Sequence, residues 1–228
     1  MKSTTTPLAA LAAVILTGWS LSTGSPVSTA LTESACAAVG GTVGPDKICH
    51  AHRDNDGYML DFRFAADYPD QRALTDFLMQ RRDDFVDWVL SMPNSYPGEL
   101  DIIGHDYRSA ATQSLVLTIG TSAGVHPVTT YKAFNYDLAK RAPITFESLF
   151  QPDAHPLPVL NPIVQPELDK HGATGSLTLD DLGATAYQNF AITDDSVIFF
   201  FDQDGLLPHE NGPLTVEVPR TDLASLLA

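Results

Sequence analysis

Residues 58–89 read YMLDFRFAADYPDQRALTDFLMQRRDDFVDWV, and the spacing of hydrophobic residues changes within this stretch. Its beginning alternates apolar and polar side chains, which is the pattern of a half-buried β-strand. After Pro69 and Asp70 the apolar residues recur at intervals of three and four, which predicts an amphipathic helix that ends before Pro93. A strand followed by a long helix with one apolar face favours an α+β fold.

The last third of the chain is rich in strand signals. The uninterrupted apolar run at residues 197–201, VIFFF, is typical of a central strand that is covered on both faces. We therefore expect mainly antiparallel sheets with one long helix and shorter helices. Further strands are expected at residues 58–64, 99–107, 115–119, 129–134, 190–193 and 214–218, and shorter helices at 143–150, 159–171 and 221–227. A boundary near residue 120 would separate two packed halves, residues 31–120 and 121–228.

The first 30 residues differ from the rest of the chain. Lys2 precedes an apolar stretch at residues 8–16, and the segment ends in Ser28-Thr29-Ala30. This pattern predicts a secretory signal peptide, residues 1–30, that is cleaved after Ala30. Because the apolar stretch is much shorter than the ~20 residues of a membrane-spanning helix, we expect no transmembrane anchor after cleavage.

Cys36 and Cys49 are the two cysteines of the chain. Export would place them in an oxidising compartment, where two thiols a short loop apart normally pair. We expect a Cys36–Cys49 disulfide in a protein that is secreted, extracellular or associated with the cell wall.

The chain is strongly acidic. Its 13 Lys and Arg against 28 Asp and Glu give a net charge of −15, and loss of Lys2 with the leader would make it −16. Such a charge repels nucleic acid and favours encounter with cationic partners, although it would also simply keep a secreted protein soluble.

Residues 120–124, GTSAG, match the Gly-x-Ser-x-Gly pattern of a nucleophilic serine on a strand-to-helix turn. The strand before Ser122 is expected, but residues 125–130 are β-branched and contain a proline, so no helix is expected after it. This context weakens the pattern, which also arises by chance, and leaves Ser122 as a candidate nucleophile only.

A serine nucleophile needs a general base and a third group that orients the base. His126 lies on the same turn as Ser122, and Asp194 or Asp195 are candidates to orient it. Asp202 and His209 form a second candidate pair. In the alternative interpretation, the His126 imidazole bonds a backbone carbonyl and only stabilises a tight turn.

Histidine and aspartate alternate over residues 50–56, HAHRDND, so a strand would place them on one face. A calcium loop starting at His52 would lack its first aspartate and would have Arg63 where the bidentate glutamate belongs. We therefore expect a solvated turn ended by Gly57, with no metal and no cofactor.

Several stretches of the chain resemble the mycobacterial secreted immunogenic protein family. The resemblance covers roughly residues 36–227, including the cysteine spacing. It rests on residues 67–71 (DYPDQ), 124–135 (GVHPVTTYKAFN), 187–195 (YQNFAITDD) leading into 197–201, 206–208 (LLP) and 218–220 (VPR).

The resemblance implies an α+β, β-grasp-like fold and a secreted or envelope-associated location. It links the C-terminal half to the extracellular domain of the lysozyme-sensing anti-sigma factor, which binds a cationic protein. One member of the family is described as a cell-wall-associated carboxylesterase. The family turn usually has Gly-Gly before x-His-Pro, whereas Ala123 replaces the first glycine here and Ser122 belongs to no shared motif. No catalytic residue is therefore carried over.

Two functions from different classes follow. The first is a monomeric, noncatalytic extracellular module that contacts a cationic extracellular protein or a host or envelope component. Its expected binding residues are Thr121, Gly124, His126, Pro127 and Tyr131. The second is a short-chain carboxylesterase with Ser122 as nucleophile, His126 as base and Asp194 as the orienting acid.

Overall fold

The structure, a computed structural model, describes residues 34–92, 97–124, 127–172, 183–203, 206 and 209–228. The expected leader, residues 1–30, and its cleavage site lie outside the described residues. No helix in the described part of the chain is both long and apolar enough to cross a membrane.

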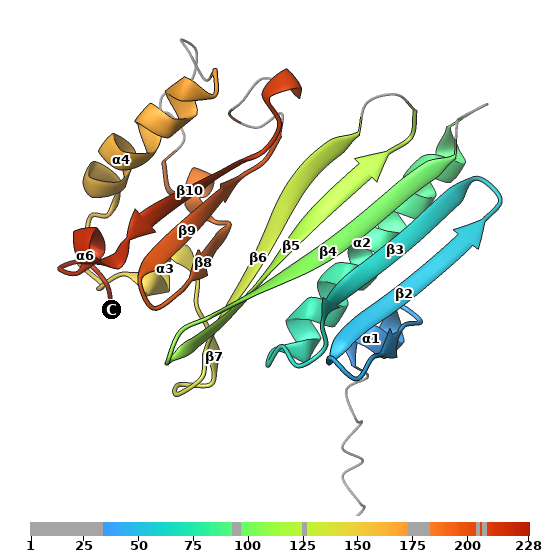
Figure 1. Ribbon diagram of the computed structural model, residues 1–228, viewed down its shortest axis with the longest axis horizontal. Coiled ribbons are helices and arrows are strands. Elements are labelled where there is room, and N and C mark those ends of the chain that lie inside the picture. Colours follow the sequence, from blue (N-terminus) through green and yellow to red (C-terminus); the bar gives the residue numbers. More distant parts are fainter. Residues whose placement is uncertain (1–33, 93–96, 125–126, 173–182, 204–205, 207–208) are drawn as a thin grey trace, which may run out of the picture. The chain divides into compact units, whose positions relative to one another are not determined.

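A strand, a helix and a second strand organise the N-terminal part, as residues 58–89 predict. They are β3 (Tyr58–Ala65), α2 (Gln71–Ser91) and β4 (Gly98–Arg108). Asp70 caps α2 by accepting the N–H of Ala73 at 3.0 Å. Because α2 carries the chain back along the sheet, β3 and β4 pair in parallel. Figure 1 shows α2 covering one face of the sheet.

These strands belong to a seven-stranded sheet with the order β1-β2-β3-β4-β5-β6-β7. All its pairs except β3–β4 are antiparallel, so the expectation of a mainly antiparallel α+β fold is confirmed. The other strands are β1 (Thr42–Val43), β2 (Ile48–Asn55), β5 (Thr112–Ser122), β6 (Val128–Asp137) and β7 (Ala142–Pro143).

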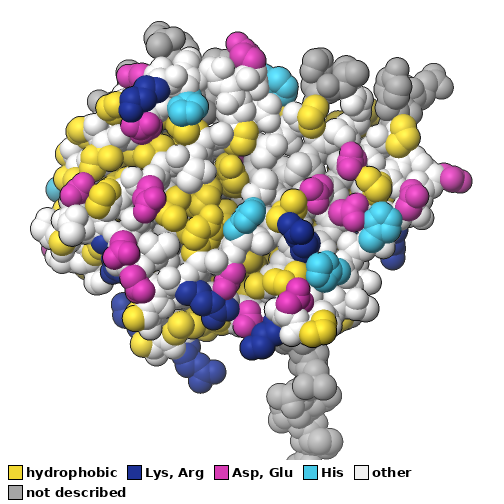
Figure 2. Space-filling view, in the orientation of Figure 1, with side chains coloured by type: hydrophobic (Ala, Val, Ile, Leu, Met, Phe, Trp, Pro, Cys, Tyr) yellow, Lys and Arg dark blue, Asp and Glu magenta, His cyan; other side chains and the backbone are white. Residues whose placement is uncertain are grey.

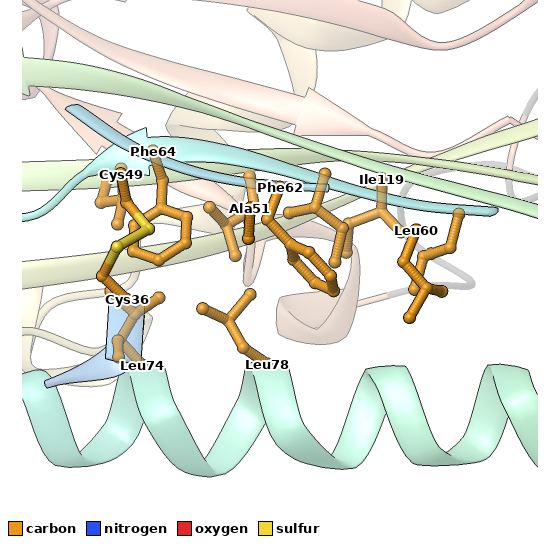
Figure 3. Close-up of a cluster of buried hydrophobic side chains, with 14 of the residues drawn as sticks. Cys36, Cys49, Ala51, Leu60, Phe62, Phe64, Leu74, Leu78 and Ile119 are labelled. Carbon is orange, nitrogen blue, oxygen red and sulfur yellow. A yellow bond between two sulfur atoms is a disulfide. The ribbon is translucent and has the colours of Figure 1, made fainter. Parts of the chain in front are cut away.

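The face of this sheet that packs on α2 is apolar. Alternate residues of β3, β4 and β5 point toward the helix, because side chains alternate between the two faces of a strand. The buried residues include Leu60, Phe62, Phe64, Leu74, Leu78, Leu100, Ile102, Leu115 and Leu117. Figure 3 shows the sheet side chains pointing down onto Leu74 and Leu78 of α2.

The disulfide that the sequence predicts is present. Cys36 and Cys49 are bonded across a sequence separation of 13 residues, and both are buried. The bond joins α1 (Ala35–Ala38) to β2, and Figure 3 shows it beside Phe64.

A smaller sheet follows, with the order β10-β9-β8. Its strands are β8 (Phe190–Ile192), β9 (Ser196–Phe201) and β10 (Leu214–Pro219). The expected central strand is confirmed as β9, which is covered on both faces. Phe199 and Phe201 belong to the core under α4, whereas Phe200 packs with Val116 of the larger sheet.

Helix α4 (Leu157–Lys170) corresponds to the helix expected at residues 159–171, and it contains two internal prolines, although proline usually kinks or breaks a helix. Pro162 and Pro166 are exposed, while Leu160 and Val164 are fully buried. The carbonyl groups that lose their N–H partner therefore face water, which can hydrogen-bond to them.

The remaining elements are short, and the described chain has two main cores. These elements are α3 (Phe146–Leu149), η1 (Gly183–Tyr187), η2 (His209–Asn211) and α6 (Arg220–Leu223). One core draws on residues 35–136 and the other on residues 144–227. The cores thus change over near β7. Residue 120, near which a boundary between two packed halves was expected, lies within β5, which pairs with β6 over ten residue positions.

Candidate functional site

The face of the seven-stranded sheet that α2 does not cover carries a row of polar side chains. The strand registers align His52 with Asp61, Asp61 with Asp101, and Asp101 with Gly120. Residues aligned across a sheet point to the same face, so the side chains of His52, Asp61 and Asp101 form one line across β2, β3 and β4 that ends at Gly120 of β5. The next line along the strands pairs Glu99 with Ser122.

This row lies in a shallow open cavity of about 450 Å³, which we call the acidic groove. Its charged lining consists of the carboxylates of Asp61, Glu99 and Asp101 and the guanidinium of Arg63, together with His50 and His52. Figure 2, which views this open face, shows acidic, histidine and basic side chains close together over β2–β4. The carboxylates outnumber the guanidinium, so the groove attracts cations when its histidines are neutral.

Two pKa shifts follow from the geometry of the acidic groove. His52 Nδ1 lies 2.8 Å from Asp61 Oδ1, and this hydrogen bond, followed by the charge of Asp61, raises the His52 pKa. Partial burial raises the pKa of the Asp101 carboxyl, and the neighbouring Asp61 charge raises it further while Arg63 lowers it. The surroundings of Asp101 therefore disfavour its negative charge, and a bound cation would stabilise that charge.

We expect His52 to titrate above the ordinary histidine pKa of about 6.5, because Asp61 stabilises the imidazolium. The stability that this pair contributes is fully present below the unfolded pKa and is lost as the pH rises through the folded pKa. An NMR titration of the ring protons measures the shift. Asp61→Asn should return the His52 pKa toward its ordinary value, and Asp153→Asn, which removes an exposed charge elsewhere, should not. An unchanged His52 pKa in Asp61→Asn would contradict the assignment.

Ser122 is the half-buried last residue of β5. The chain enters β6 at Val128, so the serine stands between two strands of a hairpin and not between a strand and a helix. This is not the backbone geometry of a nucleophile elbow. His126 lies outside the described residues.

Asp194 is placed far from Ser122. Its Oδ1 accepts the N–H of Ala110 at 2.9 Å, in the turn that precedes β5, whereas Ser122 ends that strand. With 11 residues at about 3.4 Å each, β5 is about 35 Å long, and Ser122 and Asp194 lie at its opposite ends. The structure therefore does not bring Ser122 and Asp194 together. Neighbouring Asp195 accepts the N–H of Arg220 at 2.8 Å through its carbonyl, at the same end.

The expected binding residues occupy different surroundings. Gly124 and Pro127 are exposed at the β5–β6 hairpin, and Gly124 has a φ of +133° that favours glycine. The Thr121 hydroxyl accepts Arg81 Nη2 at 2.8 Å, on the helix side of the sheet. The Tyr131 ring packs against Phe200 with centroids 5.2 Å apart, so it lies between the two sheets.

The second candidate pair, Asp202 and His209, lies at the same end of the sheet as Ser122. Gln203 exchanges hydrogen bonds with the backbone of Thr129, at 2.9 and 3.1 Å, and its Nε2 lies 3.3 Å from His209 Nδ1. Thr129 in turn aligns with Gly120 of β5. These hydrogen bonds connect the end of β9 to the edge of β6 that faces away from β5.

Sequence reasoning did not identify the acidic groove. Asp61 and Asp101 were visible as polar residues within apolar strands, but their meeting depends on the parallel register of β3 with β4. That register is set by the way α2 connects β3 to β4, and no short stretch of the sequence indicates it.

Comparisons with known proteins first define the class of fold. Residues 147–221 match the family described as "Protein of unknown function (DUF3298)". The solved structure of a DUF3298 family protein from Pseudomonas aeruginosa superposes with a TM-score of 0.57 at 10% identity, covering 79% of this chain and 93% of that one. The protein therefore has the α+β fold seen in that structure.

Curated relatives then define the family. Esterase Rv3036c of Mycobacterium tuberculosis is 44% identical over 226 residues, which cover 96% of this chain and 96% of that protein. Immunogenic proteins MPB64 of Mycobacterium bovis and MPT64 of Mycobacterium tuberculosis are each 42% identical over 212 residues, covering 90% of this chain and 92% of theirs. The chain belongs to this family of mycobacterial immunogenic proteins, as its resemblance predicted.

Proposed function

We propose that the protein is a secreted, noncatalytic binding module that recognises a cationic protein, or another cationic host or envelope component, through the acidic groove. The observation that carries the proposal is the row of His52, Asp61 and Asp101 in an open cavity on a sheet face that no helix covers. The net charge of −15 has the same sign and would steer a cationic partner toward the protein.

The β5–β6 hairpin is the second part of the proposed contact surface. Ser122 aligns with Glu99, so the hairpin begins where the acidic groove ends. Exposed Gly124 and Pro127 lie beyond it. A partner that covers the groove would therefore also reach the hairpin. The disulfide and the expected leader support a location outside the cytoplasm, in the medium or at the cell wall.

A labelled hexalysine peptide is a suitable first probe, measured by fluorescence anisotropy against the purified protein. The double variant Asp61→Asn/Asp101→Asn keeps the shape of both side chains and removes two of the charges in the acidic groove. We expect about tenfold weaker binding, because two close attractive contacts with the ammonium groups are lost. Added salt should weaken binding to the native protein for the same reason.

The matched control is Asp153→Asn/Asp222→Asn, which removes two exposed carboxylates from the other end of the chain. Both double variants have the same net charge. Equal loss of affinity in both would show that the overall charge attracts the peptide, and it would refute a specific role for the acidic groove.

Hydrolysis of a short-chain carboxylic ester is the second candidate function, favoured by the name of the relative Esterase Rv3036c. Ser122 with His126 is the candidate pair, and Asp202 with His209 lies at the same end of the sheet. A p-nitrophenyl ester tests it. Loss of turnover in Ser122→Ala but not in Thr118→Ala, a hydroxyl on the same face of β5, would support the serine; unchanged turnover in Ser122→Ala would exclude it.

A further inference from the structure

A second, smaller cavity of about 230 Å³ lies at the end of β9, where β8 is too short to cover it. Asn189, the residue just before β8, accepts the Phe200 N–H through its carbonyl at 2.9 Å. Strand β9 continues past Phe200 to Phe201, where β8 no longer pairs with it. Apolar residues make up much of the lining of the cavity, namely Ala186, Phe200, Phe201 and Leu206.

Asn189 and Asp202 add polar groups to the lining. Both ends of the Asn189 side-chain amide bond to β6, because its oxygen accepts the Ala133 N–H at 3.1 Å and its nitrogen donates to the Tyr131 carbonyl at 3.0 Å. Asp202 Oδ1 accepts the Tyr131 N–H at 2.7 Å, and no donor within the described ranges bonds Oδ2. Asn189 is thus a fixed part of the wall, and Asp202 retains an oxygen for a ligand.

The Asp202 carboxylate is half-buried, and no Lys, Arg or His in the described part of the chain forms an ion pair with it. Burial raises the pKa of this carboxyl, while the Tyr131 N–H lowers it. The surroundings therefore disfavour the negative charge, and a cation entering the cavity would stabilise it. Apolar walls next to a single carboxylate suit a ligand with an apolar stem and a cationic end.

We infer that this cavity binds an alkylammonium group, either of a small free amine or of a lysine side chain, with the ammonium on Asp202 Oδ2 and the stem against Phe200 and Leu206. A lysine side chain has this form, a flexible aliphatic stem that can lie on apolar surface and a compact charge. The inference goes beyond the proposed function, because none of these residues belongs to the acidic groove.

The test is a ¹H–¹⁵N NMR titration of the purified protein with n-butylammonium and, separately, with n-butanol, its neutral counterpart. We expect butylammonium to shift the amide signals of residues 200–203 and Tyr131, and butanol to bind at least about tenfold more weakly because it cannot neutralise Asp202. Nα-acetyl-lysine-methylamide is the third ligand. The same shifts with this compound indicate a lysine side chain, and their restriction to butylammonium indicates a small free amine; either result supports the inference.

Asp202→Asn keeps an acceptor for the Tyr131 N–H and removes the charge, so it should fold and lose butylammonium binding by at least about tenfold. Asp101→Asn, in the acidic groove, should leave butylammonium binding unchanged. Equal binding of butanol and butylammonium, no shift at residues 200–203, or full affinity in Asp202→Asn would each overturn the inference. The comparison of the two ligands uses the unaltered protein, so it decides the question even if the variant does not fold. Hexalysine binding that fails to depend on Asp61 and Asp101 would refute the proposed function alone.

Discussion

Phe199→Ala is expected to lower the free energy of unfolding by about 3–5 kcal/mol, because it removes a large side chain from a closed core. Phe199 has 0% of its surface exposed. Its ring lies 5.1 Å from that of Tyr187 and 6.2 Å from that of Phe190, between centroids. Strand neighbours on both sides fix its backbone, so the core cannot close around the space that alanine leaves. Urea unfolding measures the loss.

Trp88→Ala is the matched control for the size of the side chain. Tryptophan is larger than phenylalanine, but Trp88 on α2 is 45% exposed and packs mainly against Phe85, with centroids 5.9 Å apart. Nearly half of its surface stays in contact with water, so we expect a clearly smaller loss, below about 2 kcal/mol. Equal losses in the two variants would contradict the view that β9 is the centre of the C-terminal core.

The sequence was sufficient to predict the elements whose signal is local. Helix α2, observed at Gln71–Ser91, is bounded in the sequence by Asp70 as its cap and by the proline at position 93. Strand β9 contains the unbroken apolar run at residues 197–201, which is typical of a strand covered on both faces. Such local patterns predict the observed elements because the same apolar residues are buried in the folded structure and stabilise it.

The parallel pairing of β3 with β4 could not be predicted in the same way. Alternation defines the two faces of a strand but not the partner of each edge. The acidic groove depends on that pairing, because it sets Asp61 beside Asp101. The same gap explains the failure to bring Asp194 to Ser122: both were expected near turns, and only the order of the strands shows that these turns lie at opposite ends of β5.

Removal of the Cys36–Cys49 disulfide, by Cys36→Ala/Cys49→Ala, is expected to lower the free energy of unfolding by about 3 kcal/mol. The bond closes a loop with a sequence separation of 13 residues, and its loss gives the unfolded chain more freedom. Both sulfur atoms also fill space in the core beside Phe64. For a domain of this size the melting temperature should fall by about 6–12 °C.

The same disulfide also bears on the proposed location of the protein outside the cytoplasm. Besides the disulfide, the segment around α1 is held by an Arg82 hydrogen bond to the Ala38 carbonyl, by the Ala35 N–H donating to Gln71 Oε1, and by the burial of Ala35. A reducing agent should therefore lower the melting temperature of the native protein toward that of the double alanine variant and leave the variant unchanged. If the native protein melts at the same temperature after both thiols are shown to be free, the disulfide does not stabilise the protein. The disulfide would then no longer support the proposed location in an oxidising compartment.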